Sequence, residues 1–79
     1  MDELNIWESD YRFMMIVWDN APVGSGKLVE LCRAILGWEK STTYNAIRRM
    51  SEKGLIKNDN ATVYVVIPRE RVQAVESDR

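Results

Sequence analysis

Four side chains in one short segment have the chemistry and the spacing to recognise nucleic-acid bases: Ser41, Tyr44, Asn45 and Arg48. In a helix, which turns by about 100° per residue, Ser41, Asn45 and Arg48 fall on one face with Tyr44 at its edge. Asn and Arg can each form two parallel hydrogen bonds with a base edge in the major groove, Asn with adenine and Arg with guanine. The pattern predicts a helix whose outward face reads double-stranded DNA through these four base-facing side chains.

Cationic and hydroxyl side chains at the ends and edges of this segment suit a different task, contact with the DNA backbone. Such contacts fix the position of a protein on the duplex without reading its sequence. The predicted phosphate-contacting residues are Lys40, Thr42, Arg49, Lys53 and Lys57. Further along the chain, Asn60 and Thr62 are candidate contacts from a predicted hairpin. An acid, Glu52, lies on the base-facing side of the helix, and we expect it to sit beyond the groove.

Positive charge is concentrated in the part of the chain that holds these candidates. Residues 1–26 contain five acids and one base, a net charge of −4, whereas residues 27–57 contain seven bases and three acids, a net charge of +4. Residues 58–79 contain four acids and three bases, which brings the whole chain to −1. A local phosphate-binding face needs this separation of charge and does not need a basic protein.

Length and composition favour a small binding domain over an enzyme. Seventy-nine residues suffice for one compact domain but bury too little surface for a large enclosed cavity. The absence of histidine removes Ser-His and Cys-His nucleophile pairs and the commonest metal ligand. We therefore expect no catalytic residues, no metal, no cofactor and no small-molecule substrate. Cys32 is the single cysteine, which suits the reducing cytoplasm. We also see no leader sequence and no apolar run long enough to cross a bilayer, so we expect a cytoplasmic protein.

Two helices are predicted ahead of the candidate segment. The first covers about residues 10–19, with Ser9 as its N-terminal cap and Pro22 closely following its end. The second begins at a Ser25 cap and ends at Gly37, a residue type that favours the helix C-terminus. Apolar residues recur at helical spacing in both segments, so each helix is expected to pack one face into the core.

The third helix carries the candidate residues. It is predicted to cover about residues 42–53, between a cap at Ser41 and a stop at Gly54. One of its faces is apolar apart from a threonine and is expected to pack in the core. The residues of this face are Thr43, Ala46, Ile47 and Met50.

A β-hairpin is predicted after the third helix. Residues 55–57 are extended and mainly apolar, residues 58–61 are typical of a turn, and residues 62–67 form a β-branched and aromatic run that Pro68 closes. An isolated hairpin is marginally stable, so this one must lie against the helices. Val23, between the first two helices, is expected to form a very short strand.

The predicted organisation has one folded domain and two flanking segments. Residues 1–8 are expected to form an N-terminal arm. Residues 9–68 form the domain, a mainly helical α+β fold of three helices and a small antiparallel hairpin. Residues 69–79 are expected to begin a C-terminal helix or linker, because Val72 and Val75 lie on one side of a helix.

The sequence resembles the penicillinase-repressor family of bacterial winged-helix regulators, the BlaI, MecI and CopY group. The family pattern in the third helix has a Trp, a Thr four residues later, and Arg-Leu and Lys-Gly pairs at fixed distances. The residues in those places here are Trp38, Thr42, Arg49, Met50, Lys53 and Gly54, with Met for the Leu. The end of the first helix and the segment Val63–Pro68 are also similar to the family, so the resemblance covers nearly the whole chain.

The resemblance implies a winged helix-turn-helix fold and a sequence-specific transcriptional repressor. Such a repressor binds operator DNA as a homodimer, with its third helix in the major groove. The wing turn departs from the pattern, since residues 58–61 hold an acid, Asp59, and no base. Family members also continue into a C-terminal dimerisation region. We expect a chain that stops at Arg79 to lack this region and to be largely monomeric.

A winged-helix module for protein–protein interaction, without specific DNA binding, is the alternative. The acidic overall charge and the acidic wing turn favour it. Trp7, Tyr44 and Tyr64 would then contribute to a patch that contacts a partner protein. Substitution of Arg48 separates the two hypotheses, because it should relax operator discrimination only if the helix reads DNA.

Overall fold

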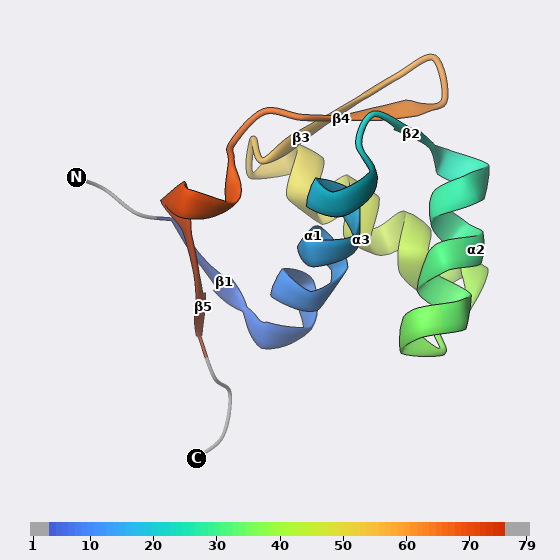
Figure 1. Ribbon diagram of the computed structural model, residues 1–79, viewed down its shortest axis with the longest axis horizontal. Helices are drawn as coiled ribbons and strands as arrows, with labels where there is room; N and C mark the ends of the chain where they lie inside the picture. The colour runs from blue at the N-terminus through green and yellow to red at the C-terminus, as the bar shows by residue number, and fades with distance from the viewer. Residues whose placement is uncertain (1–3, 76–79) are drawn as a thin grey trace.

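The structure is a computed structural model that describes residues 4–75, and three helices form its body (Figure 1). These are α1 (Glu8–Asn20), α2 (Ser25–Leu36) and α3 (Lys40–Glu52). All three helices are predicted from the sequence, and the observed ends of α1 and α3 differ from the predicted ends by one or two residues. Short links join them, so that α1 contacts both α2 and α3.

Two small sheets flank the helices. The wing sheet is antiparallel with the strand order β2-β4-β3, and its strands are β2 (Val23–Gly24), β3 (Ile56–Asp59) and β4 (Thr62–Val65). A parallel pair lies at another side of the molecule and contains β1 (Leu4–Trp7) and β5 (Val72–Val75), with the 3₁₀ turn η1 (Arg69–Arg71) before β5. The predicted winged-helix fold, α+β and mainly helical, is confirmed. The very short strand predicted at Val23 is confirmed as well.

The core lies where the three helices meet beneath the wing sheet. Fully buried side chains come from every helix and from the wing: Phe13, Met14, Val17, Leu28, Cys32, Thr43, Met50, Leu55 and Val63. The ring of Phe13 stacks on that of Trp38, with 5.9 Å between ring centroids. The apolar face predicted for the third helix is confirmed, because its four residues are all buried. This packing fixes which face of α3 points outward.

The serines predicted to cap the helices are not at the cap positions. Ser9, Ser25 and Ser41 lie inside the first turn of their helices, and the residues that precede those turns make no side-chain capping hydrogen bond. A tertiary contact replaces the cap at α2, where the backbone N–H of Ser25 donates to the carbonyl of Ala61 in the wing turn at 2.9 Å. The wing thus satisfies one of the amides that a helix start leaves unpaired.

The helix ends agree with the sequence. Gly37 follows α2 with a φ of 72°, and Gly54 follows α3 with a φ of 84°. Both values lie in the left-handed region, where glycine has no Cβ to clash with the backbone. The N–H of Gly37 donates to the carbonyl of Arg33 at 3.1 Å, which closes the last turn of α2.

The segments at the two ends of the chain pair with each other, contrary to the prediction. β1 lies parallel to β5, with Ile6 opposite Ala74 and Leu4 opposite Val72. Residues 4–7 of the expected arm are therefore a strand, and residues 69–75 of the expected helix or linker are a 3₁₀ turn followed by a strand. Residues 1–3 of the expected arm lie outside the described residues. Residues 76–79 lie outside the described residues. Burial of Ile6 and Val72 against the helices favours the strand, since tertiary packing outweighs weak local periodicity.

The wing turn holds an alanine in a backbone conformation that alanine rarely adopts. Asn60 and Ala61 form the two-residue loop between β3 and β4, with φ values of 57° and 62°. Such loops favour glycine at the second position, because a left-handed residue with a Cβ costs about 1–2 kcal/mol. Ala61→Gly relieves this strain but also gives the unfolded chain more entropy, which acts in the opposite direction. The net result is expected to be a rise of about 0.5–1 kcal/mol in the free energy of unfolding. Urea unfolding would measure this gain.

The matched control for this prediction is Asn60→Gly. Asparagine tolerates the left-handed region better than alanine does, so relief of strain at Asn60 should be smaller. An equal gain at both positions, or a loss at Ala61, would contradict the explanation by backbone strain.

The only cysteine is buried between α2 and α3 and should be chemically inert in the folded protein. Burial raises the pKa of the Cys32 thiol above its ordinary value of 9.0, and a side-chain hydrogen bond with Thr43 acts in the opposite direction. The unfolded thiol ionises first as pH rises. The stability that the neutral thiol contributes is therefore fully present below about pH 9. It is lost as the pH rises from there through the higher pKa of the folded state.

Two measurements check this expectation. A thiol reagent should label Cys32 at pH 8 only at the rate of unfolding, because the thiolate is the reactive form and the folded site excludes the reagent. In urea titrations, the stability difference between the parent protein and Cys32→Ala should shrink between pH 8 and pH 10. Rapid labelling of the native protein would show that the thiol is accessible.

Candidate nucleic-acid interface

α3 presents an outward face of polar side chains. The buried residues of α3 recur at the helical period of about 3.6 residues and therefore lie on one face, which leaves the opposite face to solvent. The four residues predicted to face bases all lie on α3 and are all exposed: Ser41, Tyr44, Asn45 and Arg48. Near the start of the helix, the hydroxyl of Thr43 donates to the carbonyl of Glu39 at 3.4 Å. The structure thus brings together the predicted base-facing set on one rigid element.

A groove of about 410 Å³ separates α3 from the wing strand β3. We call it the α3–β3 groove, and its lining residues are Tyr44, Ile47, Arg48, Ser51, Ile56, Lys57 and Asn58. Ile47 and Ile56 are buried and supply its apolar part, with exposed fractions of 3% and 2%. The groove places Lys57, predicted to contact phosphate, beside two of the predicted base-facing residues.

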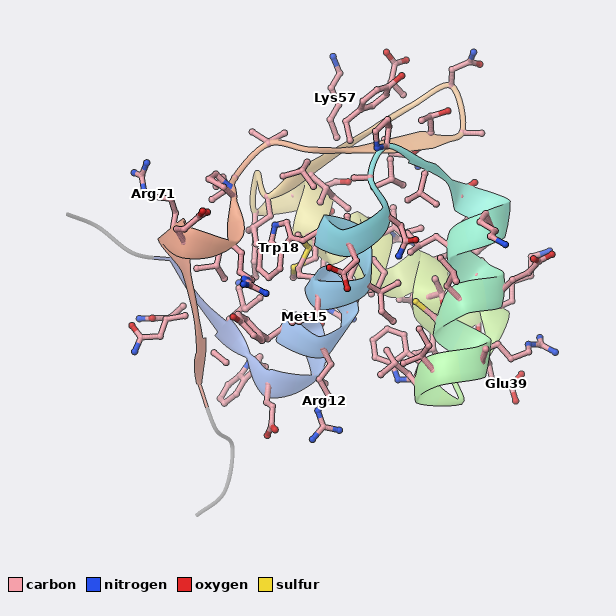
Figure 2. The ribbon with its side chains drawn as sticks, in the orientation of Figure 1. Arg12, Met15, Trp18, Glu39, Lys57 and Arg71 are labelled. Atoms are coloured by element: carbon pink, nitrogen blue, oxygen red, sulfur yellow. The ribbon has the colours of Figure 1, made fainter. Side chains whose placement is uncertain are left out.

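The two cations of the groove, Arg48 and Lys57, are exposed. Within residues 4–75, the ion pairs are Arg12 with Glu8 at 3.1 Å and Arg49 with Asp10 at 2.7 Å. Neither pair involves a groove residue, and no acid lines the groove. The charge of the groove is therefore positive and is not neutralised by any side chain in the described part of the chain. Figure 2 shows the Lys57 side chain extending from the wing away from the helices.

Arg49 has a partner inside the protein that the sequence does not reveal. Its Nη2 donates to Oδ1 of Asp10, in the first turn of α1, at 2.7 Å. The Asp10 side chain is 4% exposed, whereas the Arg49 side chain is 47% exposed. This charge-assisted hydrogen bond ties α3 to α1. It engages one amino group of a residue predicted to contact phosphate and leaves the rest of that side chain partly open to solvent.

The other predicted phosphate contacts are spread around α3. Lys40 and Thr42 are exposed in the first turn of the helix. Lys53 follows the helix and lines a small hollow with three residues of β1, Asn5, Ile6 and Trp7. The structure does not bring Lys53 to the α3–β3 groove, because Lys53 lies beside β1 and the groove lies beside β3.

The predicted wing residues lie at the end of the hairpin. Asn60 is exposed in the turn, and Thr62 is half-buried opposite Asp59. Neither lines the α3–β3 groove. Asn58 is a polar wing residue that does line the groove, and it was not predicted from the sequence. In the sequence, Asn58 belongs to a segment rich in turn-forming residues. Such a segment indicates a loop but does not show which helix the loop lies against.

The three aromatic residues of the alternative hypothesis do not line a common hollow in the described structure. Trp7 is 57% exposed and lines a hollow of about 440 Å³ together with residues of α1 and the end of α2. Tyr44 is 39% exposed and lines the α3–β3 groove. Tyr64 is 44% exposed and lies opposite Lys57 in the wing sheet. Trp7 thus lies apart from the hollow that Tyr44 lines, whereas Tyr64 is the strand neighbour of a residue of that groove.

Comparison with known proteins identifies the family. Among the described residues, no helix has the length and apolar character needed to span a membrane. Neither the comparison with curated proteins nor the comparison with solved structures gives a significant match. A family model described as penicillinase repressor matches residues 6–79, nearly the whole chain. That family consists of DNA-binding transcriptional repressors and not of enzymes. The fold, the exposed polar face of α3 and this match agree, and the chain belongs to the penicillinase repressor family.

Proposed function

We propose that the protein represses transcription by binding operator DNA with α3 in the major groove. The observation that carries this proposal is the row of exposed hydrogen-bonding side chains on α3 beside a wing strand with an exposed cation, Lys57. A major groove about 12 Å wide admits a helix of this kind. The buried face of α3 packs against the rest of the domain, so the polar face is exposed and can enter the DNA major groove.

In this proposal, sequence is read by the outward face of α3. Arg48 and Asn45 can each make bidentate hydrogen bonds, with guanine and adenine respectively. Ser41 and Tyr44 add single hydrogen bonds or apolar contacts to neighbouring bases. These side chains are held by a helix whose opposite face is buried, which limits the conformational freedom that binding must remove.

Phosphate contacts position the helix and supply much of the affinity. Lys40 and Thr42 at the start of α3 and Lys57 on the wing are exposed and suited to this role. Lys53 and the exposed part of Arg49 lie along the other side of α3. They would contact the phosphates on the opposite wall of the DNA major groove. Asn60 and Thr62 can add uncharged contacts from the wing. Affinity should fall with salt with a log-log slope of about −0.9 per neutralised phosphate.

We propose that the repressor acts as a homodimer. Two copies related by a two-fold axis would present their α3 helices about 34 Å apart to a pseudo-palindromic operator. Each copy would read one half-site. Sedimentation of the present chain, with and without a duplex that carries two half-sites, would show whether these 79 residues associate alone or only on DNA.

Selection of bound duplexes from a random pool, at a stated ionic strength, tests the proposed function. A shared motif that reads as half-sites would support sequence-specific binding. Recovery of unrelated duplexes, together with retention on DNA that does not change with salt, would overturn it. The protein-interaction module would then be the better assignment, although Trp7 lines a different hollow from Tyr44.

A further inference from the structure

The parallel pair of β1 and β5 has an open edge. Among the described residues these two strands pair only with each other, so each has one side without a strand partner. Figure 1 shows β5 at the margin of the molecule, with β1 between it and α1 in this view. Gln73 and Ala74 make no backbone hydrogen bond outside this sheet with another described residue. The edge of β5 therefore presents backbone N–H and C=O groups with which a further strand can pair.

Neither strand carries the charges that commonly protect sheet edges. Charged side chains on an edge strand hinder its pairing with another chain. The wing has this protection, because its edge strand β3 holds Lys57 and Asp59, both exposed. The strands β1 and β5 read LNIW and VQAV and include no charged residue. Their exposed side chains, Asn5, Trp7 and Gln73, are uncharged, so the edge of β5 is open to pairing.

A second copy of this chain is the partner that suits such an edge. A two-fold axis places the same strand of each copy side by side and antiparallel, so a charge near the axis would face itself. β5 has no such charge, and a glutamine amide complements a second one because it both donates and accepts. With Gln73 opposite Gln73 of the second copy, Val72 of one copy lies opposite Ala74 of the other. Both of these side chains are apolar, so the register matches polar with polar and apolar with apolar.

We propose that the edge of β5 pairs with the edge of β5 in a second copy, which joins two domains through one sheet in the order β1-β5-β5-β1. The inference rests on the proposed function, for which it names the surface that joins the two copies, and this surface is not the C-terminal dimerisation region of the family. β1 lines a hollow with Lys53, beyond the end of α3, and none of the base-facing residues lines that hollow. The joint therefore leaves the base-facing residues uncovered.

The length of the strands sets the strength of this pairing. A stable interface buries about 1,200–2,000 Å², and two paired strands of four residues are too short to supply it. The chain is therefore expected to be monomeric when dilute. Two copies should pair when neighbouring half-sites of one duplex hold them close together, because the second contact is then effectively intramolecular.

An engineered disulfide tests the pairing without DNA. Directly opposite residues of antiparallel strands have Cβ atoms about 4.5–5.5 Å apart, close to the span of a disulfide. Gln73→Cys should therefore form a covalent dimer on mild oxidation at high protein concentration. Asn5→Cys is the matched control, because Asn5 is exposed on the same face but would lie three strand spacings, about 14 Å, from its counterpart. Cys32 is buried and should not contribute.

Charge exchange on DNA gives an independent readout. The parent should bind a duplex with two half-sites about 5- to 150-fold more tightly than its affinity for single half-sites predicts, the usual range for coupled sites. Gln73→Lys alone and Gln73→Glu alone should each remove this factor, because like charges would face each other, and an equal mixture of the two should restore it. Asn5→Lys should keep it, since about 14 Å exceeds the screening length of about 8–10 Å. Circular dichroism would confirm that the variants are folded.

Three results would overturn the inference while DNA binding by α3 stands. The first is that Gln73→Cys forms no more covalent dimer than Asn5→Cys. The second is that cooperative binding persists in both Gln73→Lys and Gln73→Glu. The third is that the mixture of these variants is no more cooperative than either one alone. Failure of the parent to bind any duplex would instead reject the proposed function, and the disulfide formed without DNA would still decide whether β5 pairs with β5.

Discussion

Arg49→Ala is expected to lower the free energy of unfolding by about 3 kcal/mol. The substitution leaves the carboxylate of Asp10, 4% exposed, without the guanidinium that lies 2.7 Å from it. Removal of one member of a buried ion pair typically costs about 3–5 kcal/mol, and the lower end applies because the Arg49 side chain is half exposed. For a domain of this size, the melting temperature should fall by roughly 12–24 °C. Thermal and urea unfolding would measure both quantities.

The neighbouring arginine is the control for this prediction. Arg48 is exposed and takes part in none of the ion pairs of residues 4–75, so Arg48→Ala should change stability by no more than about 0.5 kcal/mol. The double variant Asp10→Ala/Arg49→Ala should lose less than the sum of its two single variants, because it leaves no unpaired charge. Equal stability of Arg48→Ala and Arg49→Ala would contradict a structural role for the Asp10–Arg49 pair.

Arg48→Ala is expected to reduce discrimination between the selected operator and unrelated duplexes by about 5- to 150-fold. That range corresponds to about 1–3 kcal/mol, the value of one good bidentate contact with a base. The loss should concentrate at one base pair, where the variant tolerates substitutions that the parent rejects. Competition binding with a set of single base-pair variants of the operator, at fixed salt, is the measurement.

The control for operator discrimination is Lys40→Ala. Lys40 is exposed at the start of α3, and a contact with phosphate there should weaken binding to all duplexes alike. Arg48→Lys should also lose discrimination, because lysine keeps the charge but not the planar fork of guanidinium donors. If Arg48→Ala and Lys40→Ala both weaken every duplex to the same extent, Arg48 contacts the backbone and reads no base.

These two predictions give adjacent arginines opposite roles that the sequence does not distinguish. Both are cationic, both are exposed to some extent, and both belong to the same helix. A helical projection puts Arg48 near the centre of the polar face and Arg49 at its edge, and the edge is where a neighbouring helix can supply a partner. Asp10 lies 39 positions earlier in the chain, and local patterns carry no information about that separation.

The ends of the chain show the same limit. Val72 and Val75 have a spacing that suits a helix, and the spacing alone predicts one. The pairing of β5 with β1 gives this segment backbone partners and buries Val72 against the helices. A strand partner more than sixty positions away is decided by the packing of the whole domain. Ser25 is not a cap for a related reason, since the wing turn accepts a hydrogen bond from its backbone N–H at the start of α2.

Local patterns along the chain predict the three helices, the hairpin, the buried face of α3 and the family resemblance, because periodicity, turn residues and motif spacing are properties of short segments. Three further contacts appear only once the domain is folded: Arg49 is held by Asp10, Lys53 lies beside β1, and Lys57 and Asn58 line a groove with Tyr44 and Arg48. Those outcomes depend on how the elements pack around one core. That packing is set by the burial of side chains from all of them at once.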